Sequence, residues 1–422
     1  MNKSSTFKLI HQGLLVGGFL ASSATLAVAQ DSPTLAELVQ ENKALTARIE
    51  ALEQKEAAAS ATPAPSTVPV AMPASPFGNL SISGFAQASY FSNLNDTAAQ
   101  RIPTYLWNNK NNNFSINKVK LTFATPPAVR SDTDWSAAAR VSLMAGEDAP
   151  VLNSSSGTTG FDYLREAYVE MNAPIGSGLI IRAGELISLL NWESGDGGAA
   201  NPNFSQGYQW YYTGNGPSAG VQADYAFTNW VSLTARVDNG LYAGPIGVAN
   251  KKSGMASLNL KPTKDLWFNL IGFAGLGGGA LDANGGSIIG GYQITPKLGT
   301  GFEGDYFSFH NQGNASGALP SIGGWIWYDF TPQYGLAFRA EYLDDKNGVG
   351  INGGPNPFGA GSGLVSTSPN GELESFTLTF NWHPVPALKI QPEFRVNHTS
   401  YSGGFAGKQY EYIVGMGATY SF

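Results

Sequence analysis

Apolar and polar residues alternate along most of the chain from Asn79 onward. In the segment Lys118–Phe123, Val119, Leu121 and Phe123 fall at every second position, and the residues between them are polar. Successive side chains of a β-strand point to opposite faces, so this alternation predicts a strand with one apolar and one polar face. The same pattern recurs further along the chain, for example at 231–238, 336–342 and 376–382.

The connections between these predicted strands are of two kinds. Seven are short and contain proline or asparagine, whereas eight are long and rich in Gly, Asn, Ser and Asp. The two kinds alternate along the chain, which predicts sixteen strands. Membrane barrels have short periplasmic turns and long outer loops. We therefore expect residues 79–422 to form an all-β, 16-stranded antiparallel transmembrane β-barrel, with both chain ends in the periplasm. The long connections are expected near 93–112, 147–160, 190–215, 239–252, 275–286, 309–320, 344–372 and 398–409.

The final segment, YIVGMGATYSF, carries the alternation to the last residue of the chain. Phe422, Tyr420, Ala418 and Met416 are all apolar or aromatic. Chain ends usually fray, so a strand of this strength is expected at the end only if it pairs with the first strand and closes the barrel. An unpaired strand edge in lipid would leave backbone groups without hydrogen bonds. Phe422 and Tyr420 also resemble the assembly signal of bacterial outer-membrane proteins, which implies recognition by the barrel assembly machinery.

Large aromatic residues flank the predicted periplasmic turns. Aromatic side chains are enriched where a membrane protein meets the membrane–water interface, and barrels carry them as girdles. We therefore expect a girdle formed by Trp230, Trp267, Tyr328, Phe330, Tyr334 and Trp382.

The composition agrees with an exported membrane barrel. Among the 422 residues there is no cysteine, only 13% are charged, and the formal net charge is −7, which argues against nucleic acid as a partner. Residues 1–29 combine a basic start, a short apolar core and an Ala-Val-Ala motif, which is the pattern of a secretory signal peptide. A barrel exported in this way would have outer-membrane lipid as its surroundings.

A heptad pattern occupies residues 30–57. The apolar and polar residues at its a and d positions are Leu35, Leu38, Asn42, Leu45, Ile49 and Leu52. This spacing predicts a short periplasmic coiled-coil helix through which copies of the chain associate. An amphipathic helix lying on its own domain would have the same spacing. Residues 58–78 are rich in proline and alanine and are expected to form an extended linker.

The polar face of the predicted strands would line the barrel interior. By parity it carries eight basic and nine acidic residues. Buried charges need water or partners, and a 16-stranded barrel is wide enough for an aqueous channel. Passive diffusion of small polar solutes or ions is therefore the simplest function. The expected pore-lining residues are Lys118, Lys120, Arg140, Arg182, Glu193, Asp196, Arg236, Arg339 and Arg395.

The long connection at 190–215 is the candidate constriction. If it folds inward, Glu193 and Asp196 would face a basic wall, and the field between them would filter solutes by charge. Arg339 is expected on the far wall, nearer the periplasmic mouth. The alternative is an outward-standing loop with solvated charges. The basic wall would consist of Lys118, Lys120, Arg140 and Arg182.

Residues 163–212 resemble a known family. Three motifs are similar to the OmpL-like family of outer-membrane β-barrel porins. They are the Arg-Glu-Ala-Tyr strand, the Gly-Leu-Ile-Ile-Arg-Ala-Gly strand with the glutamate that follows it, and the Asn-Pro-Asn-Phe-Ser motif. A heptad before a barrel also resembles the phosphate-selective and DcaP-like trimeric porins. These resemblances imply a homotrimer of passive channels. An anion-selective channel is the alternative that the phosphate-type resemblance implies.

The same sequence bears on two other classes of protein, an enzyme and a structural barrel. The histidines beyond the signal peptide lie in expected loops and turns, without the spacing of a nucleophile motif or a metal site. We therefore expect no enzyme, no cofactor and no metal. A structural barrel whose coiled coil binds peptidoglycan is the remaining alternative, and a closed lumen would favour it.

Overall fold

The computed structural model describes residues 79–96, 98–105, 107–153, 162–214, 216–240, 252–277, 281–311, 316–346, 348, 351 and 370–422. They all belong to one compact unit, Phe77–Phe422. The signal peptide expected at 1–29 and the linker expected at 58–78 lie outside the described residues. So does the coiled coil expected at 30–57, with its Leu35, Leu38, Asn42, Leu45, Ile49 and Leu52.

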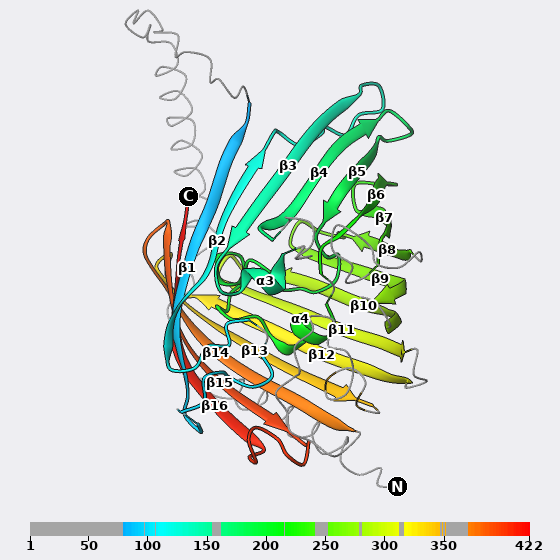
Figure 1. Ribbon diagram of the computed structural model, residues 1–422. Coiled ribbons are helices and arrows are strands. Elements are labelled where there is room, and N and C mark those ends of the chain that lie inside the picture. The colour runs from blue at the N-terminus through cyan, green and yellow to red at the C-terminus, as the bar shows by residue number, and fades with distance from the viewer. Residues whose placement is uncertain are drawn as a thin grey trace, which may run out of the picture. The chain divides into compact units, whose positions relative to one another are not determined.

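The described residues contain sixteen β-strands that form one closed barrel (Figure 1). Each strand pairs antiparallel with the next, and β1 pairs antiparallel with β16. The strands are β1 (Ser81–Asn93), β2 (Asn113–Ala124), β3 (Ser136–Ala145), β4 (Leu164–Ala173), β5 (Leu179–Leu186), β6 (Ser218–Ala226), β7 (Val231–Asp238), β8 (Ser253–Leu260), β9 (Leu266–Gly277), β10 (Leu281–Gln293), β11 (Leu298–Asn311), β12 (Ser316–Asp329), β13 (Tyr334–Asp345), β14 (Gly371–Val385), β15 (Leu388–Thr399) and β16 (Tyr410–Ser421). Three short helices lie in the connections: α3 (Ala149–Leu152), η1 (Gly197–Ala199) and α4 (Tyr208–Tyr212).

The last strand closes the barrel, as the sequence predicts. Phe85 of β1 lies opposite Ser421 of β16, and the pairing continues to Asn93. Beyond the strand, the Phe422 N–H donates to the Gly84 carbonyl at 3.0 Å, and the Gly84 N–H donates to the Phe422 carbonyl at 2.9 Å. The C-terminal residue is therefore part of the seam, which leaves no free edge at this junction.

The two faces of the wall have the polarity that the alternation predicts. On β13, Leu336 and Phe338 are exposed on the outside, whereas Arg339 and Glu341 are buried inside. Most of the expected girdle is also exposed, namely Trp230, Tyr328, Phe330, Tyr334 and Trp382. Trp267 is the exception, because it packs against the apolar cluster of the interior. It has the inward parity of its strand, which proximity to a turn does not reveal.

Two of the expected long loops are strands instead. The segments 275–286 and 309–320 were expected to be loops because they are rich in glycine, asparagine and serine. β9 and β10 leave only residues 278–280 between them, and β11 and β12 leave only 312–315. Glycine in a strand can serve close backbone approach. A Cβ at Gly285 would lie only 2.0 Å from the Tyr306 carbonyl oxygen.

The other connections segregate by end of the barrel. One end, here called the short-turn end, carries the turns at 227–230, 261–265, 294–297, 330–333 and 386–387 among others. The opposite end, the long-loop end, carries the connections at 94–112, 146–163, 187–217, 239–252, 346–370 and 400–409. The connection at 187–217 is called the third loop below, and the connection at 94–112 the first loop.

Candidate constriction inside the barrel

The third loop folds into the barrel instead of standing outside it. It contains η1 and α4, and all five residues of α4 are buried. η1 contacts β1, β15 and β16, whereas α4 contacts β12 and β13 (Figure 1). The two helices of the loop therefore pack against the part of the wall that runs from β12 round to β1.

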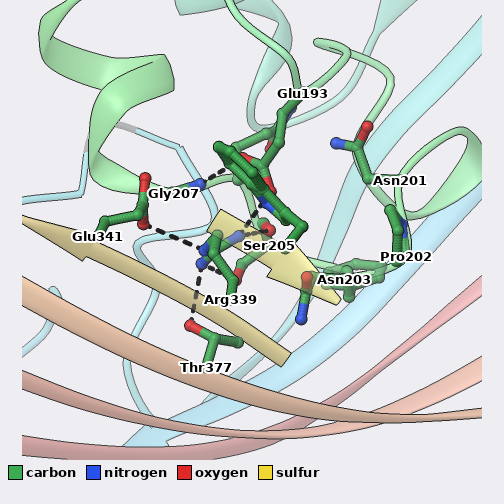
Figure 2. A network of polar contacts seen from close by, with 12 residues as sticks. Glu193, Asn201, Pro202, Asn203, Ser205, Gly207, Arg339, Glu341 and Thr377 are labelled. Carbon is green, nitrogen blue, oxygen red and sulfur yellow. Dashed lines mark hydrogen bonds and ion pairs between the residues drawn. The ribbon is translucent and has the colours of Figure 1, made fainter. Parts of the chain in front are cut away.

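Arg339 of β13 is the main cationic anchor of the loop. Its Nη1 donates to Glu193 Oε1 at 2.8 Å and to the Ser205 carbonyl at 2.6 Å, and its Nη2 donates to Thr377 Oγ1 at 3.0 Å (Figure 2). Its Nε also lies 3.1 Å from a carboxylate oxygen of Glu341. The side chains of Arg339, Glu193 and Glu341 are at most 1% exposed. Glu193 thus pairs with Arg339, and not with the basic wall expected from the sequence.

Carboxylates on the wall bind backbone N–H groups of the loop. Glu341 accepts hydrogen bonds from the N–H groups of Tyr208 and Gln209, both at 3.0 Å. These donors lie at the start of α4, where helical N–H groups lack partners within the helix. The same arrangement is repeated by Glu393 with the N–H groups of Phe204 at 3.0 Å and Ser205 at 3.3 Å, and by Glu303 with that of Trp192 at 2.7 Å.

Asp196 pairs with the basic wall as expected, but with one residue of it. Lys120 Nζ lies 2.8 Å from Asp196 Oδ2. Gln87 donates to the Asp196 carbonyl at 2.8 Å. Lys118 lies on the same strand and donates to Gln206 Oε1 at 3.4 Å instead. A β-bulge between β1 and β2 turns both Asn117 and Lys118 inward.

The other two members of the expected basic wall pair with neighbouring strands. Arg140 lies 2.6 Å from Glu166, and Arg182 lies 2.6 Å from Glu170 and 2.8 Å from Asp224. The Arg140 and Arg182 side chains are 36% and 30% exposed, whereas that of Arg339 is 0% exposed. Solvent therefore reaches Arg140 and Arg182 inside the barrel, whereas the third loop covers Arg339.

Arg236 and Arg395 are both buried and serve the loops. Arg236 donates to the carbonyls of Leu186 at 2.9 Å and Ile187 at 2.6 Å, where the third loop begins. The guanidinium carbon of Arg395 lies 4.7 Å from the ring centre of Phe91 and 4.5 Å from that of Tyr105. This cation–π stacking attaches the first loop to the wall.

The first loop also enters the lumen, which the sequence analysis missed. Trp107 stacks on Tyr211 with 3.9 Å between ring centres, and the Tyr211 hydroxyl donates to the Trp107 carbonyl at 2.6 Å. The Tyr212 hydroxyl donates to the Thr104 carbonyl at 2.8 Å. Burial raises the pKa of Tyr211 well above its ordinary value, so this hydroxyl remains a donor. Large aromatic residues in an otherwise polar loop are the signal that was available.

Comparison with known proteins adds the family. A family model described as "Putative beta-barrel porin-2, OmpL-like" matches residues 79–422. No curated protein matches this chain. No helix among the described residues has the length and hydropathy to cross a membrane.

Solved structures with a similar fold include three outer-membrane proteins. The outer membrane channel DcaP of Acinetobacter baumannii is 12% identical, covers 81% of this chain and 97% of its own, and has a TM-score of 0.52. OmpT of Vibrio cholerae, in its trimer form, is 10% identical with 81% and 99% covered and a TM-score of 0.52. An anion-selective porin from Comamonas acidovorans gives the same four values. At such identities the likeness establishes the fold alone.

Proposed function

This chain belongs to the OmpL-like β-barrel porin family and is a passive diffusion channel of the bacterial outer membrane. We propose that solutes cross this channel along β3–β6, beside the docked third loop. The observation that carries this route is the contrast in exposure between the two sides of the lumen. Arg140 and Arg182 are about one-third exposed, whereas Arg339 and Glu193 are buried.

The constriction lies, in this proposal, between the Lys120–Asp196 pair and the row formed by Arg140 and Arg182. Lys120 and Asp196 are 10% and 24% exposed, so a permeating ion can approach both charges. Lys120, Arg140 and Arg182 each have an acidic partner within 3 Å. We therefore infer that the channel discriminates weakly between anions and cations.

Conductance and reversal potential in planar bilayers test this route. Wild-type protein should give stepwise, ohmic conductance and a reversal potential near zero in a KCl gradient. Lys120→Ala leaves Asp196 without its cation and should shift selectivity toward cations, and Asp196→Ala should shift it toward anions. A permeating ion about 4 Å from an unpaired charge interacts with it by about 1 kcal/mol in water and by about 4 kcal/mol at an effective dielectric constant near 20. This energy is enough to change the ratio of anion to cation permeability several-fold.

Arg339→Gln is the matched comparison, because this residue is buried away from the proposed path. This substitution should make the third loop open more often and should leave the sign of the reversal potential unchanged. The route is wrong if Lys120→Ala and Asp196→Ala shift the reversal potential in the same direction. A folded protein that conducts no current would contradict the channel itself.

The assembly we propose is a homotrimer joined in part by the heptad at 30–57. Two considerations support it: the Leu35-to-Leu52 repeat in the sequence, and the trimer form of OmpT among the proteins with this fold. Native mass measurement of the mature protein should show three chains. Deleting residues 30–57 should weaken the assembly and leave the barrel folded. A monomer in mild detergent, with or without this segment, would contradict the proposal.

A further inference from the structure

A cavity of about 360 Å³ adjoins the third loop on the side of the short turns. Asp329 and Lys389 line it, and they lie next to the turns 330–333 and 386–387. Residues 200–202 of the third loop form the opposite wall. The volume falls in the range of about 300–1,000 Å³ that is usual for small-molecule sites. The cavity therefore lies between the third loop and the short-turn end of β12, β14 and β15.

Two tryptophans provide its aromatic surface. Trp192 from the third loop and Trp327 from β12 both line the cavity, and their ring centres are 5.7 Å apart. Trp325 stacks on Trp192 at 4.7 Å with an interplanar angle of 23°, which holds the indole of the loop in place. Both lining indoles are partly exposed. The wall thus presents a supported aromatic platform.

Inward-facing glycines on β11 make room for this platform. A Cβ at Gly301 would lie 2.2 Å from Cε2 of Trp192, and a Cβ at Gly299 would lie 2.1 Å from Cζ2 of Trp327. Real Cβ atoms do not approach so closely, so any larger residue at either position would displace an indole. The arrangement of the tryptophans therefore depends on the wall beneath them.

Polar groups without partners surround the platform. Asn381 is only 7% exposed, and its Oδ1 accepts a hydrogen bond from Gln391, but its side-chain NH₂ group has no partner among the described residues. The carboxylate of Asp329 and the imidazole of His383 also make no hydrogen bond within that part of the chain. Lys389 is already fixed, because its Nζ donates to the Asn201 carbonyl at 2.8 Å. Asp329 is exposed and His383 is partly exposed, so these groups can donate to and accept from a polar ligand that enters the cavity.

We propose that this cavity binds a neutral pyranose sugar. The apolar C–H face of a pyranose ring would lie on the indoles of Trp192 and Trp327, and its hydroxyl groups would bond to Asp329, Asn381 and His383. The carboxylate of Asp329 and the ammonium of Lys389 oppose each other in charge, so the site favours neither anions nor cations. The proposal rests on the channel function and names a solute class for it.

D-glucose is the probe, and the open-chain hexitol sorbitol is its control. Both are neutral and of similar size, but only glucose has a ring that can stack on an indole. In single-channel recordings glucose should cause brief closures whose frequency saturates with concentration, and sorbitol should reduce the current only in proportion to bulk conductivity. Trp327→Ala should raise the half-saturating glucose concentration by about three- to tenfold, the range expected for one aromatic contact.

Trp135→Ala is the matched control variant, because Trp135 lies in the connection between β2 and β3 and is 67% exposed. It should leave glucose binding unchanged. Equilibrium dialysis of the detergent-solubilised full-length protein with glucose measures the site independently of conduction. The proposal is overturned if glucose and sorbitol act alike, if dialysis shows no binding, or if Trp327→Ala and Trp135→Ala bind glucose equally. Loss of conductance with glucose binding retained would contradict the channel function alone.

Discussion

Replacing Arg339 with methionine should release the third loop from the wall. Arg339 lies 2.8 Å from Glu193 and 3.1 Å from Glu341, and all three side chains are at most 1% exposed. At an effective dielectric constant near 20, two unit charges 4 Å apart attract each other by about 4 kcal/mol. Removing one partner of a buried pair typically costs about 3–5 kcal/mol, since the other charge stays buried and unpaired. Here two carboxylates would lose their cation.

The loop can relieve this cost by leaving its docked position. A change of about 1.4 kcal/mol is tenfold in an equilibrium constant. A cost of about 3–5 kcal/mol would therefore raise the ratio of released to docked loops by about a hundred- to several thousandfold. Single-channel recordings should show larger and noisier conductance steps than wild type. The heat-modifiable gel mobility of a closed barrel should persist, because the strand pairing does not involve this side chain.

Arg140→Met is the control for this prediction. Arg140 also pairs with a carboxylate, but its partner Glu166 is on the wall. Neither residue has a hydrogen bond or ion pair with the described residues of the third loop. Its removal should change ion selectivity and leave the noise unaltered. Adding Glu193→Gln and Glu341→Gln to Arg339→Met should restore quiet recordings, since no unpaired carboxylate would remain. A folded Arg339→Met protein with wild-type conductance and noise would refute the reasoning.

Two further predictions concern the seam and a buried carboxyl. Deleting Phe422 removes two hydrogen bonds with Gly84 at the seam between β1 and β16. The rate of folding into lipid vesicles, followed by gel shift, should therefore fall several-fold. An unchanged folding rate would contradict a role of Phe422 in assembly. Burial raises the pKa of the Asp148 carboxyl, so its contribution to stability is present below the unfolded-state pKa and is lost as the pH rises through the folded-state pKa. Urea unfolding of wild type should therefore weaken relative to Asp148→Asn as the pH rises from that range toward neutrality, and parallel pH profiles would contradict this.

The barrel itself is predictable from sequence because its determinants are local. Alternation fixes which face of a strand each residue occupies, so the inward parity of Lys120, Arg140, Arg182 and Arg339 follows from the residues beside them. Closure by the last strand follows from the same pattern. The long loops predicted at 275–286 and 309–320 are wrong, because glycine-rich segments suit either a loop or a closely packed strand.

The docking of the third loop was only partly predictable. Asp196 meets Lys120 as expected, but the pairing of Glu193 with Arg339 depends on where a 31-residue connection turns in space, since it runs from 187 to 217. The wall carboxylates Glu341 and Glu393 bind backbone N–H groups, which every residue but proline carries. No side-chain pattern in the loop could reveal those contacts. The stacking of Trp107 on Tyr211 likewise joins two loops about a hundred positions apart in the chain.

Attachment of the third loop through its main chain has a consequence for how the channel can change. Glu341, Glu393 and Glu303 all bind backbone N–H groups of the loop, and these hydrogen bonds do not depend on which side chain the loop residue carries. Glu303 and Glu393 also accept hydrogen bonds from the side chains of Asn191 and Ser205, so substitution is freest at the other loop positions. Proline at any of the donating positions, for example Tyr208 or Gln209, is an exception, because it has no N–H to donate. The docked position of the third loop is thus largely independent of the side chains that the loop presents to a solute. Solute preference can be redesigned, or can drift, by exchanging side chains on a loop whose path through the lumen is retained.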